Sequence, residues 1–181
     1  MYNEIKIVVG SWGSYNACNE RALGSEWICL NDFECWEDIE EELKEQGFEL
    51  NGMDEELFIQ DIEGIDCSST NWDYMHPKRL FETLKESEVL DDVYKFKVME
   101  AYIEVNSWND FERLIENYGS RWDDDIILWE NMDMVDVAQH YVDECYDLPE
   151  IAQRYFDYEA FARDLSYDGF YETSCGVIEI R

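Results

Sequence analysis

Carboxylates are the side chains of this sequence that could most readily do chemistry, because 45 of its 181 residues are Asp or Glu. Two carboxyl groups held at a set separation in a cleft can cleave a glycosidic bond. With acids this frequent, close pairs arise by chance, so no pair indicates an acid–base site. His140, beside Tyr141 in a predicted helix, and His76, before Pro77, are typical of structural histidines. No serine or cysteine motif accompanies them, and we expect no enzyme.

Cofactor and metal sites are not indicated either. The stretch 10–13 is not G-x-G-x-x-G, and no Walker lysine follows it. The acidic run at 123–125 continues into Ile126 without the alternation or the glycine of a calcium-binding loop. The six cysteines lie far apart and form no Cys-x-x-Cys pair, so zinc spacing is absent. We therefore expect no cofactor, and no metal beyond weak, nonspecific divalent binding.

The charge and the apolar content of the chain form an unusual combination. Its formal net charge is −32, yet 46% of its residues are hydrophobic and 15% are aromatic. Chains with so high a charge usually lack the apolar surface needed to fold, whereas this apolar content is that of a globular protein. The acids are spread evenly, with 15 in residues 1–60, 14 in 61–120 and 16 in 121–181. A folded polyanion is predicted, not an acidic tail.

Such a surface predicts a cationic partner, because it strains the compact state and attracts positive charge. B-DNA carries one charge per ~1.7 Å of axis, so 32 charges match roughly 54 Å, or about 16 base pairs. Direct binding of nucleic acid would need basic patches on the surface. We therefore expect no direct nucleic-acid binding. Competition with DNA for a DNA-binding protein is the favoured interpretation. Simple solubility or adaptation to high salt is the plainer alternative.

The sequence also predicts where the protein works. The first residues lack a basic segment followed by an apolar core, so we expect no signal peptide. No apolar run approaches the ~18 residues of a membrane helix, so we expect no membrane partner. Cysteines without a disulfide pattern are typical of a reducing compartment. The expected location is the cytoplasm.

The first part of the chain predicts a small antiparallel sheet with one helix. Alternating or apolar runs predict strands at 5–9, 25–30 and 57–62. The stretch 10–14 is expected to break the first strand. Asn31 or Asp32 is expected to cap a helix that carries Trp36 and stops at Gly47.

The rest of the chain predicts a helical middle and a mixed end. Pro77 suits the start of a helix, and Asp91 or Asp92 suits the start of the next. Apolar spacing predicts a third helix that ends at Gly119. Further elements are a strand at 125–130, helices at 133–145 and 157–165, and a hairpin at 170–180. The expected class is α+β, an elongated chain of three small domains at 1–67, 68–122 and 123–181.

The end of the chain carries a specific signature, YFDYEAFARDL at 155–165 followed by Gly169 and VIEI at 177–180. Upstream of it lie a helical segment at 134–144 and an aromatic-x-x-Asp-x-Glu segment at 58–63. Near the start, Tyr15, Asn16, Gly24 and Trp27 complete the set. In their order and approximate spacing, over nearly the whole chain, these segments resemble the ArdA antirestriction family.

The resemblance implies a DNA mimic. Proteins of this family are carried by mobile elements such as conjugative plasmids and transposons, and they occupy the DNA-binding groove of type I restriction–modification enzymes. They are elongated, curved homodimers of three-domain chains joined through their C-terminal domains, and their carboxylates imitate phosphates. The middle of this chain, 72–121, carries no matching motif. It holds most of the bases, among them Lys78, Arg79, Lys85, Lys95, Lys97 and Arg113.

The acids that flank the matched segments are the candidate phosphate mimics. They are Asp61, Glu63, Asp123, Asp124, Asp125, Asp133, Asp136, Asp143, Glu144, Asp147, Asp157, Glu159 and Asp164. Some of them are expected to serve instead as helix caps or as partners of Arg154 or Arg163. The alternative function is that of an acidic interaction protein that sequesters another basic DNA-binding protein. The sequence separates the two only through the family resemblance.

Overall fold

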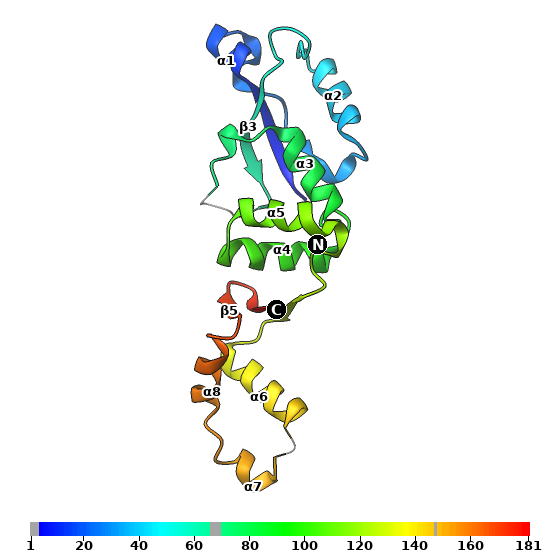
Figure 1. The fold of residues 1–181 in the computed structure, drawn as a ribbon. Coiled ribbons are helices and arrows are strands. Elements are labelled where there is room, and N and C mark those ends of the chain that lie inside the picture. Colours follow the sequence, from blue (N-terminus) through cyan, green and yellow to red (C-terminus); the bar gives the residue numbers. More distant parts are fainter. Residues whose placement is uncertain (1–3, 66–69, 147) are drawn as a thin grey trace.

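The computed structural model describes residues 4–65, 70–146 and 148–181. The elements follow one another along a single long axis, with α1 and α2 towards one end and α7 at the other (Figure 1). Helices are combined with two small antiparallel sheets, which confirms the α+β class. Within the described residues, none of the helices is both long and apolar enough to cross a membrane.

The first region is a three-stranded antiparallel sheet with helices beside it. Its elements are β1 (Lys6–Ser11), α1 (Trp12–Ala17), β2 (Ile28–Cys29), α2 (Trp36–Glu45) and β3 (Leu57–Glu63). The strand order is β2-β1-β3, so the largely buried β1 lies in the centre. The second strand is shorter than predicted. Ser25 N still donates to Val9 O at 2.8 Å, but Val9 N donates to Ser25 Oγ at 2.9 Å, so a side chain replaces one of the two backbone bonds there.

One local prediction for this region was wrong, and one short helix was not predicted. Neither Asn31 nor Asp32 caps α2, which begins after Cys35. The Asn31 side chain instead accepts a hydrogen bond from Ile5 N and donates one to Leu90 O. The first strand ends within the stretch 10–14, at Ser11, and the unpredicted α1 follows at once. Tertiary contacts and a short helix cannot be read from local propensity alone.

The middle region contains the helices α3 (Pro77–Glu86), α4 (Val93–Val105) and α5 (Trp108–Tyr118). Pro77 occupies the first turn of α3, as predicted. Asp92 caps α4 by accepting from Tyr94 N and Lys95 N. Gly119 ends α5 with a φ of 58°, a conformation that favours glycine. The three predicted helices of this region are confirmed.

The last region combines a second antiparallel sheet with helices. Its elements are β4 (Ile126–Glu130), α6 (Met134–Cys145), α7 (Glu150–Gln153), α8 (Tyr158–Leu165), β5 (Phe170–Thr173) and β6 (Gly176–Ile180). The strand order is β4-β6-β5, with the predicted hairpin between β5 and β6. The four-residue α7 was not predicted, because one turn is too short to show a helical period.

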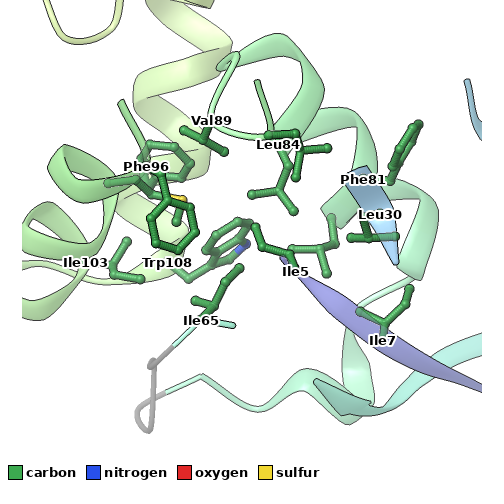
Figure 2. Close-up of a cluster of buried hydrophobic side chains, with 14 of the residues drawn as sticks. Ile5, Ile7, Leu30, Ile65, Phe81, Leu84, Val89, Phe96, Ile103 and Trp108 are labelled. Carbon is green, nitrogen blue, oxygen red and sulfur yellow. The ribbon is translucent and has the colours of Figure 1, made fainter. Parts of the chain in front are cut away.

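The hydrophobic core joins the first two regions. Buried side chains from the first sheet meet side chains of the three middle helices (Figure 2). The same cluster continues to Ile126, Leu128 and Ile178 of the last region. A separate, smaller cluster lies among α6, α8 and the hairpin. The middle helices therefore connect the two sheets, and α4 is apolar on several faces because it packs on both sides.

Candidate acidic interaction surface

The three predicted domains differ strongly in charge. Residues 1–67 hold 18 acids and 3 bases, a formal charge of −15. Residues 123–181 hold 16 acids and 3 bases, a charge of −13. Residues 68–122 hold 11 acids and 7 bases, a charge of only −4. The negative potential is therefore concentrated towards the two ends of the molecule.

Helix α2 presents a dense row of carboxylates. Its buried face consists of Trp36, Ile39 and Leu43, so the other positions point outward. Five acids without an ion-pair partner in the described structure lie there, namely Glu37, Asp38, Glu41, Glu42 and Glu45. Ten helical residues rise ~15 Å, which gives roughly one such acid per 3 Å. A DNA strand carries one phosphate per ~3.4 Å of axis.

The acids of α2 are absent from the predicted set of phosphate mimics. That set was chosen around segments that resemble the family, and α2 lies outside those segments. The signal was nevertheless present in the sequence, because nearly every position between the three core residues is acidic. A helix that is charged on its whole outer face exceeds what solubility requires.

Asp61 and Glu63 lie on β3, at the edge of the first sheet. Both are exposed, and two residues along a strand face the same side at a separation of ~7 Å. Lys6 pairs with Glu63 in the strand register, but its ammonium binds Glu4 at 2.7 Å. The two acids therefore form an outward-facing pair on the sheet edge. They also protect that edge from pairing with another strand.

The acidic run that precedes β4 divides into two kinds of residue. Asp123 is half-buried, and its carboxylate lies 3.6 Å from Lys95 Nζ. Asp124 and Asp125 are exposed at a hollow of about 260 Å³ that they share with Arg121. Asp123 thus contributes to an internal ion pair, whereas its two neighbours are presented to solvent.

Three predicted mimics are helix caps. Asp133 accepts hydrogen bonds from the amides of Val135 and Asp136, both at 2.8 Å, and Asp136 bonds back to Asp133 N at 3.3 Å. Asp157 accepts from Ala160 N at 2.9 Å. All three side chains are exposed. Their negative potential is nonetheless partly offset by the positive end of the helix that each one caps.

The remaining predicted acids lie on α6 and α8. Asp143, Glu144, Glu159 and Asp164 are all exposed. Glu144 lies 3.3 Å from His140 Nε2, one helical turn away. Asp147 lies outside the described residues. The structure therefore distributes the described members of the predicted set over several elements. Asp124 and Asp125 share the hollow before β4, and Glu159 lines a larger one of about 740 Å³ with Glu104 and Glu172.

The two histidines have structural contacts. His76 caps α3 by accepting from Lys78 N at 3.1 Å, and burial followed by the nearby Lys78 lowers its pKa. The ring of His140 packs edge-on against Trp129, with centroids 4.9 Å apart. Across the described ranges, no group of three or more His, Cys, Asp or Glu side chains could hold a metal ion.

The cations are engaged with carboxylates of the same molecule. All six lysines and arginines of 72–118 form ion pairs, including Lys85 with Glu34 and Asp91. Burial lowers the pKa of Lys95, but the hydrogen bond to Glu88 and the charges of Asp123 and Glu88 outweigh it, so the pKa is raised. Internal pairing therefore neutralises these six bases of the middle region, and each pair also uses a carboxylate of the same molecule.

The chain is a folded polyanion of formal charge −32, with exposed carboxylates on α2, β3, α6 and α8. The family model of the antirestriction protein ArdA matches residues 7–179, nearly the whole chain. The chain therefore belongs to the ArdA antirestriction family, as its signature segments predicted. A comparison with curated proteins gives no match.

Proposed function

We propose that this protein occupies the DNA-binding groove of a type I restriction–modification enzyme and so blocks the enzyme. Lysines and arginines that normally contact phosphates would contact carboxylates of the inhibitor. The inhibitor needs no catalytic step and no cofactor for this. The observation that carries the proposal is the row of exposed acids on α2, together with the −15 and −13 charges of the two ends.

The spacing of the acids supports DNA mimicry over simple solubility. The α2 acids recur at nearly the axial density of phosphates in one DNA strand. Exposed acids continue on β3, before β4 and on α6 and α8. The proposed surface comprises the α2 acids and the predicted set without Asp123, which is paired with Lys95.

We further propose that the protein is a homodimer joined through its C-terminal region. Three large apolar side chains of that region are highly exposed, namely Ile151 at 72%, Tyr155 at 86% and Tyr167 at 87%, although Leu23 and Tyr74 elsewhere are exposed to a similar degree. Exposed apolar groups that gather in one region are typical of interaction sites. Sedimentation equilibrium tests this proposal, and a monomer at micromolar concentration would contradict it.

The decisive experiment is DNA cleavage by a purified type I restriction enzyme with this protein titrated in at about 50 and 200 mM salt. Near-stoichiometric inhibition is expected at low salt. The affinity should fall by on the order of 100-fold at high salt, because charged contacts dominate the binding. Excess nonspecific DNA should relieve the inhibition.

The same titration also tests the alternative function. If a folded preparation leaves cleavage unchanged at both salt concentrations, occupation of the type I groove is excluded. The polyanionic surface would then indicate an acidic protein that sequesters another basic DNA-binding protein. Capture of purified DNA-binding proteins of that kind would follow.

A further inference from the structure

The helix α4 carries polar links to the last region that the proposed surface does not use. Lys95 Nζ lies 2.8 Å from Glu88, donates to Ser120 O and lies 3.6 Å from Asp123. Lys97 Nζ binds Glu130 at the end of β4. These contacts join α4, whose apolar side chains belong to the core of the first two regions, to the segment around β4 that begins the last region.

A third link runs from the other end of α4 to the β5–β6 hairpin. Glu104 accepts hydrogen bonds from Ser174 N at 2.9 Å and from Ser174 Oγ at 2.8 Å. The carboxylate thereby fixes the turn of the hairpin. Figure 1 shows α4 facing the C-terminal hairpin, with the other middle helices on its far side.

The positions of Lys95, Lys97 and Glu104 along α4 determine which movements of the last region their contacts can oppose. Residues advance by 100° in a helix, so Lys97 lies about 200° from Lys95 and Glu104 lies about 180° from it. Lys97 and Glu104 therefore share one face, and Lys95 lies on the opposite face. Lys95 and Glu104 are separated by ~13 Å along the axis. Links on both faces and near both ends oppose rotation as well as bending.

One of the three links is more than an ordinary surface pair. The Lys95 side chain is 13% exposed and that of Asp123 is 19% exposed, so both are largely screened from solvent. Lys97–Glu130 and Glu104–Ser174 are more exposed, and what distinguishes them is that they join α4 to the last region. Isolated exposed ion pairs contribute little, because water and side-chain entropy oppose them. By contrast, Lys78–Glu82 and Lys44–Glu40 are exposed pairs within single helices and join no two regions.

We propose that Lys95, Lys97 and Glu104, here called the α4 seam, hold the two acidic ends in the relative orientation that fits the groove. The inference rests on the proposed function. The two lysines are positioning residues, which act through the placement of carboxylates elsewhere. They explain why a protein selected for negative charge keeps bases in its middle region, since each base lowers the net charge but fixes the geometry.

The test uses two double variants that change the net charge equally. Lys95→Met with Lys97→Met removes the basic links of the seam, and Lys44→Met with Lys78→Met removes two pairs within single helices. Each double variant has a formal charge of −34 in place of −32. If charge alone set the affinity, both would inhibit at least as well as the native protein. The seam predicts a loss of about tenfold for the first variant only.

Small-angle X-ray scattering of the unbound protein supplies a second readout that needs no restriction enzyme. The seam variant should scatter differently from the native protein, and the control variant should not. Unchanged scattering, unchanged inhibition or equal losses in both variants would each overturn the proposal. If the native protein fails to inhibit, the proposed function falls, while the scattering still decides whether the seam fixes the orientation.

A charge exchange guards against a variant that merely fails to fold. Lys97→Glu should weaken inhibition and alter the scattering, because two carboxylates then face each other. Adding Glu130→Lys restores an opposite pair at the native net charge and should recover both properties. Failure of the exchange to recover either property, with helical circular dichroism intact, would contradict the role of this link.

Discussion

Helices α2 and α4 both carry lysines and acids, but their charges face different partners. In α2 the single lysine pairs with Glu40 in the same helix, Glu42 is half-buried and accepts from Gln46, and the remaining acids face solvent. In α4 both lysines reach carboxylates outside the helix. The acids of the ends thus form a surface, whereas many acids of the middle serve as ion-pair partners within the fold. Net charge per region therefore indicates what the carboxylates of that region do.

The strongest test of this comparison neutralises four acids in each region. The end variant carries Glu37→Gln, Asp38→Asn, Glu41→Gln and Glu45→Gln. The middle variant carries Glu82→Gln, Glu86→Gln, Asp91→Asn and Glu116→Gln. The half-inhibitory concentration of the end variant should rise on the order of 100-fold. Each of the four lost contacts weakens charge-driven binding by a few-fold, and these factors multiply.

The middle variant should lose less than about threefold, since it lies in the region of charge −4. Both variants change the net charge by the same amount, so the comparison isolates position. Equal losses would show that the target responds to total charge and not to the arrangement of the ends. Circular dichroism of both variants verifies that the helices remain.

The sequence predicted most of the fold because local signals and tertiary contacts agree over most elements. Pro77, Asp92, Asp133 and Asp157 mark helix starts where the structure has them. The prediction that Asn31 caps α2 was wrong. Its side chain instead bonds Ile5 N and Leu90 O, which lie in segments far from it in sequence. The shared core of the first two regions is likewise a tertiary property that no periodicity reveals.

The candidate surface was less predictable than the fold. Sequence alone cannot separate a carboxylate that faces solvent from one that caps a helix or pairs with a lysine. Asp123 and Asp124 are neighbours, yet the first binds Lys95 and the second is exposed. The density of acids in α2 is a signal present in the sequence. The predicted phosphate mimics, however, flank the segments that resemble the family, and α2 lies outside those segments.

The middle region yields the largest expected effect on stability. Glu112 is 3% exposed, one of its oxygens accepts from Arg79 Nη2 at 2.7 Å, and the other has no partner within the described structure. Arg79→Met should lower the free energy of unfolding by about 2 kcal/mol, because a buried carboxylate loses its cation. The exposure of Arg79 keeps the effect below that of a fully buried pair.

Urea unfolding measures this loss. Arg113→Met is the matched control. Arg113 pairs with Asp110 at 3.3 Å on the exposed side of α5, the helix that carries Glu112. Its removal should cost less than about 0.5 kcal/mol. A similar cost for both variants would show that burial of Glu112 does not distinguish the two pairs.

Asp54 is the exception among the described acids of the first region, because it is buried. It accepts from Ser14 Oγ at 2.5 Å and from Glu49 N at 2.8 Å. Burial raises its pKa, but hydrogen bonds from Ser11, Ser14 and Glu49 and the charge of Arg21 outweigh this, so the pKa lies below 3.8. Asp54→Asn should lower the free energy of unfolding by about 1.5 kcal/mol at pH 7. The asparagine side chain is neutral and has one oxygen, so it cannot accept all of these hydrogen bonds.

The pH dependence of this cost follows from the lowered pKa. A carboxyl whose pKa is lower in the folded state stabilises the fold above its unfolded pKa, and this stability is lost as pH falls through the folded pKa. The difference between native protein and Asp54→Asn should therefore shrink below about pH 4. Urea unfolding at pH 7 and pH 3 measures it, with the exposed Asp61→Asn as control. A difference as large at pH 3 as at pH 7 would contradict the ionic role.

The smallest expected effect is that of a single acid at an end. Asp143 is exposed on α6, so Asp143→Ala should raise the half-inhibitory concentration by less than about threefold. Asp133→Ala should affect binding equally little but cost about 1 kcal/mol of stability, because Asp133 caps the same helix. Inhibition assays and urea unfolding of both variants separate surface charge from capping. A tenfold loss of inhibition from Asp143→Ala alone would indicate an interface dominated by a few residues, and the two ends would then no longer act as distributed charge.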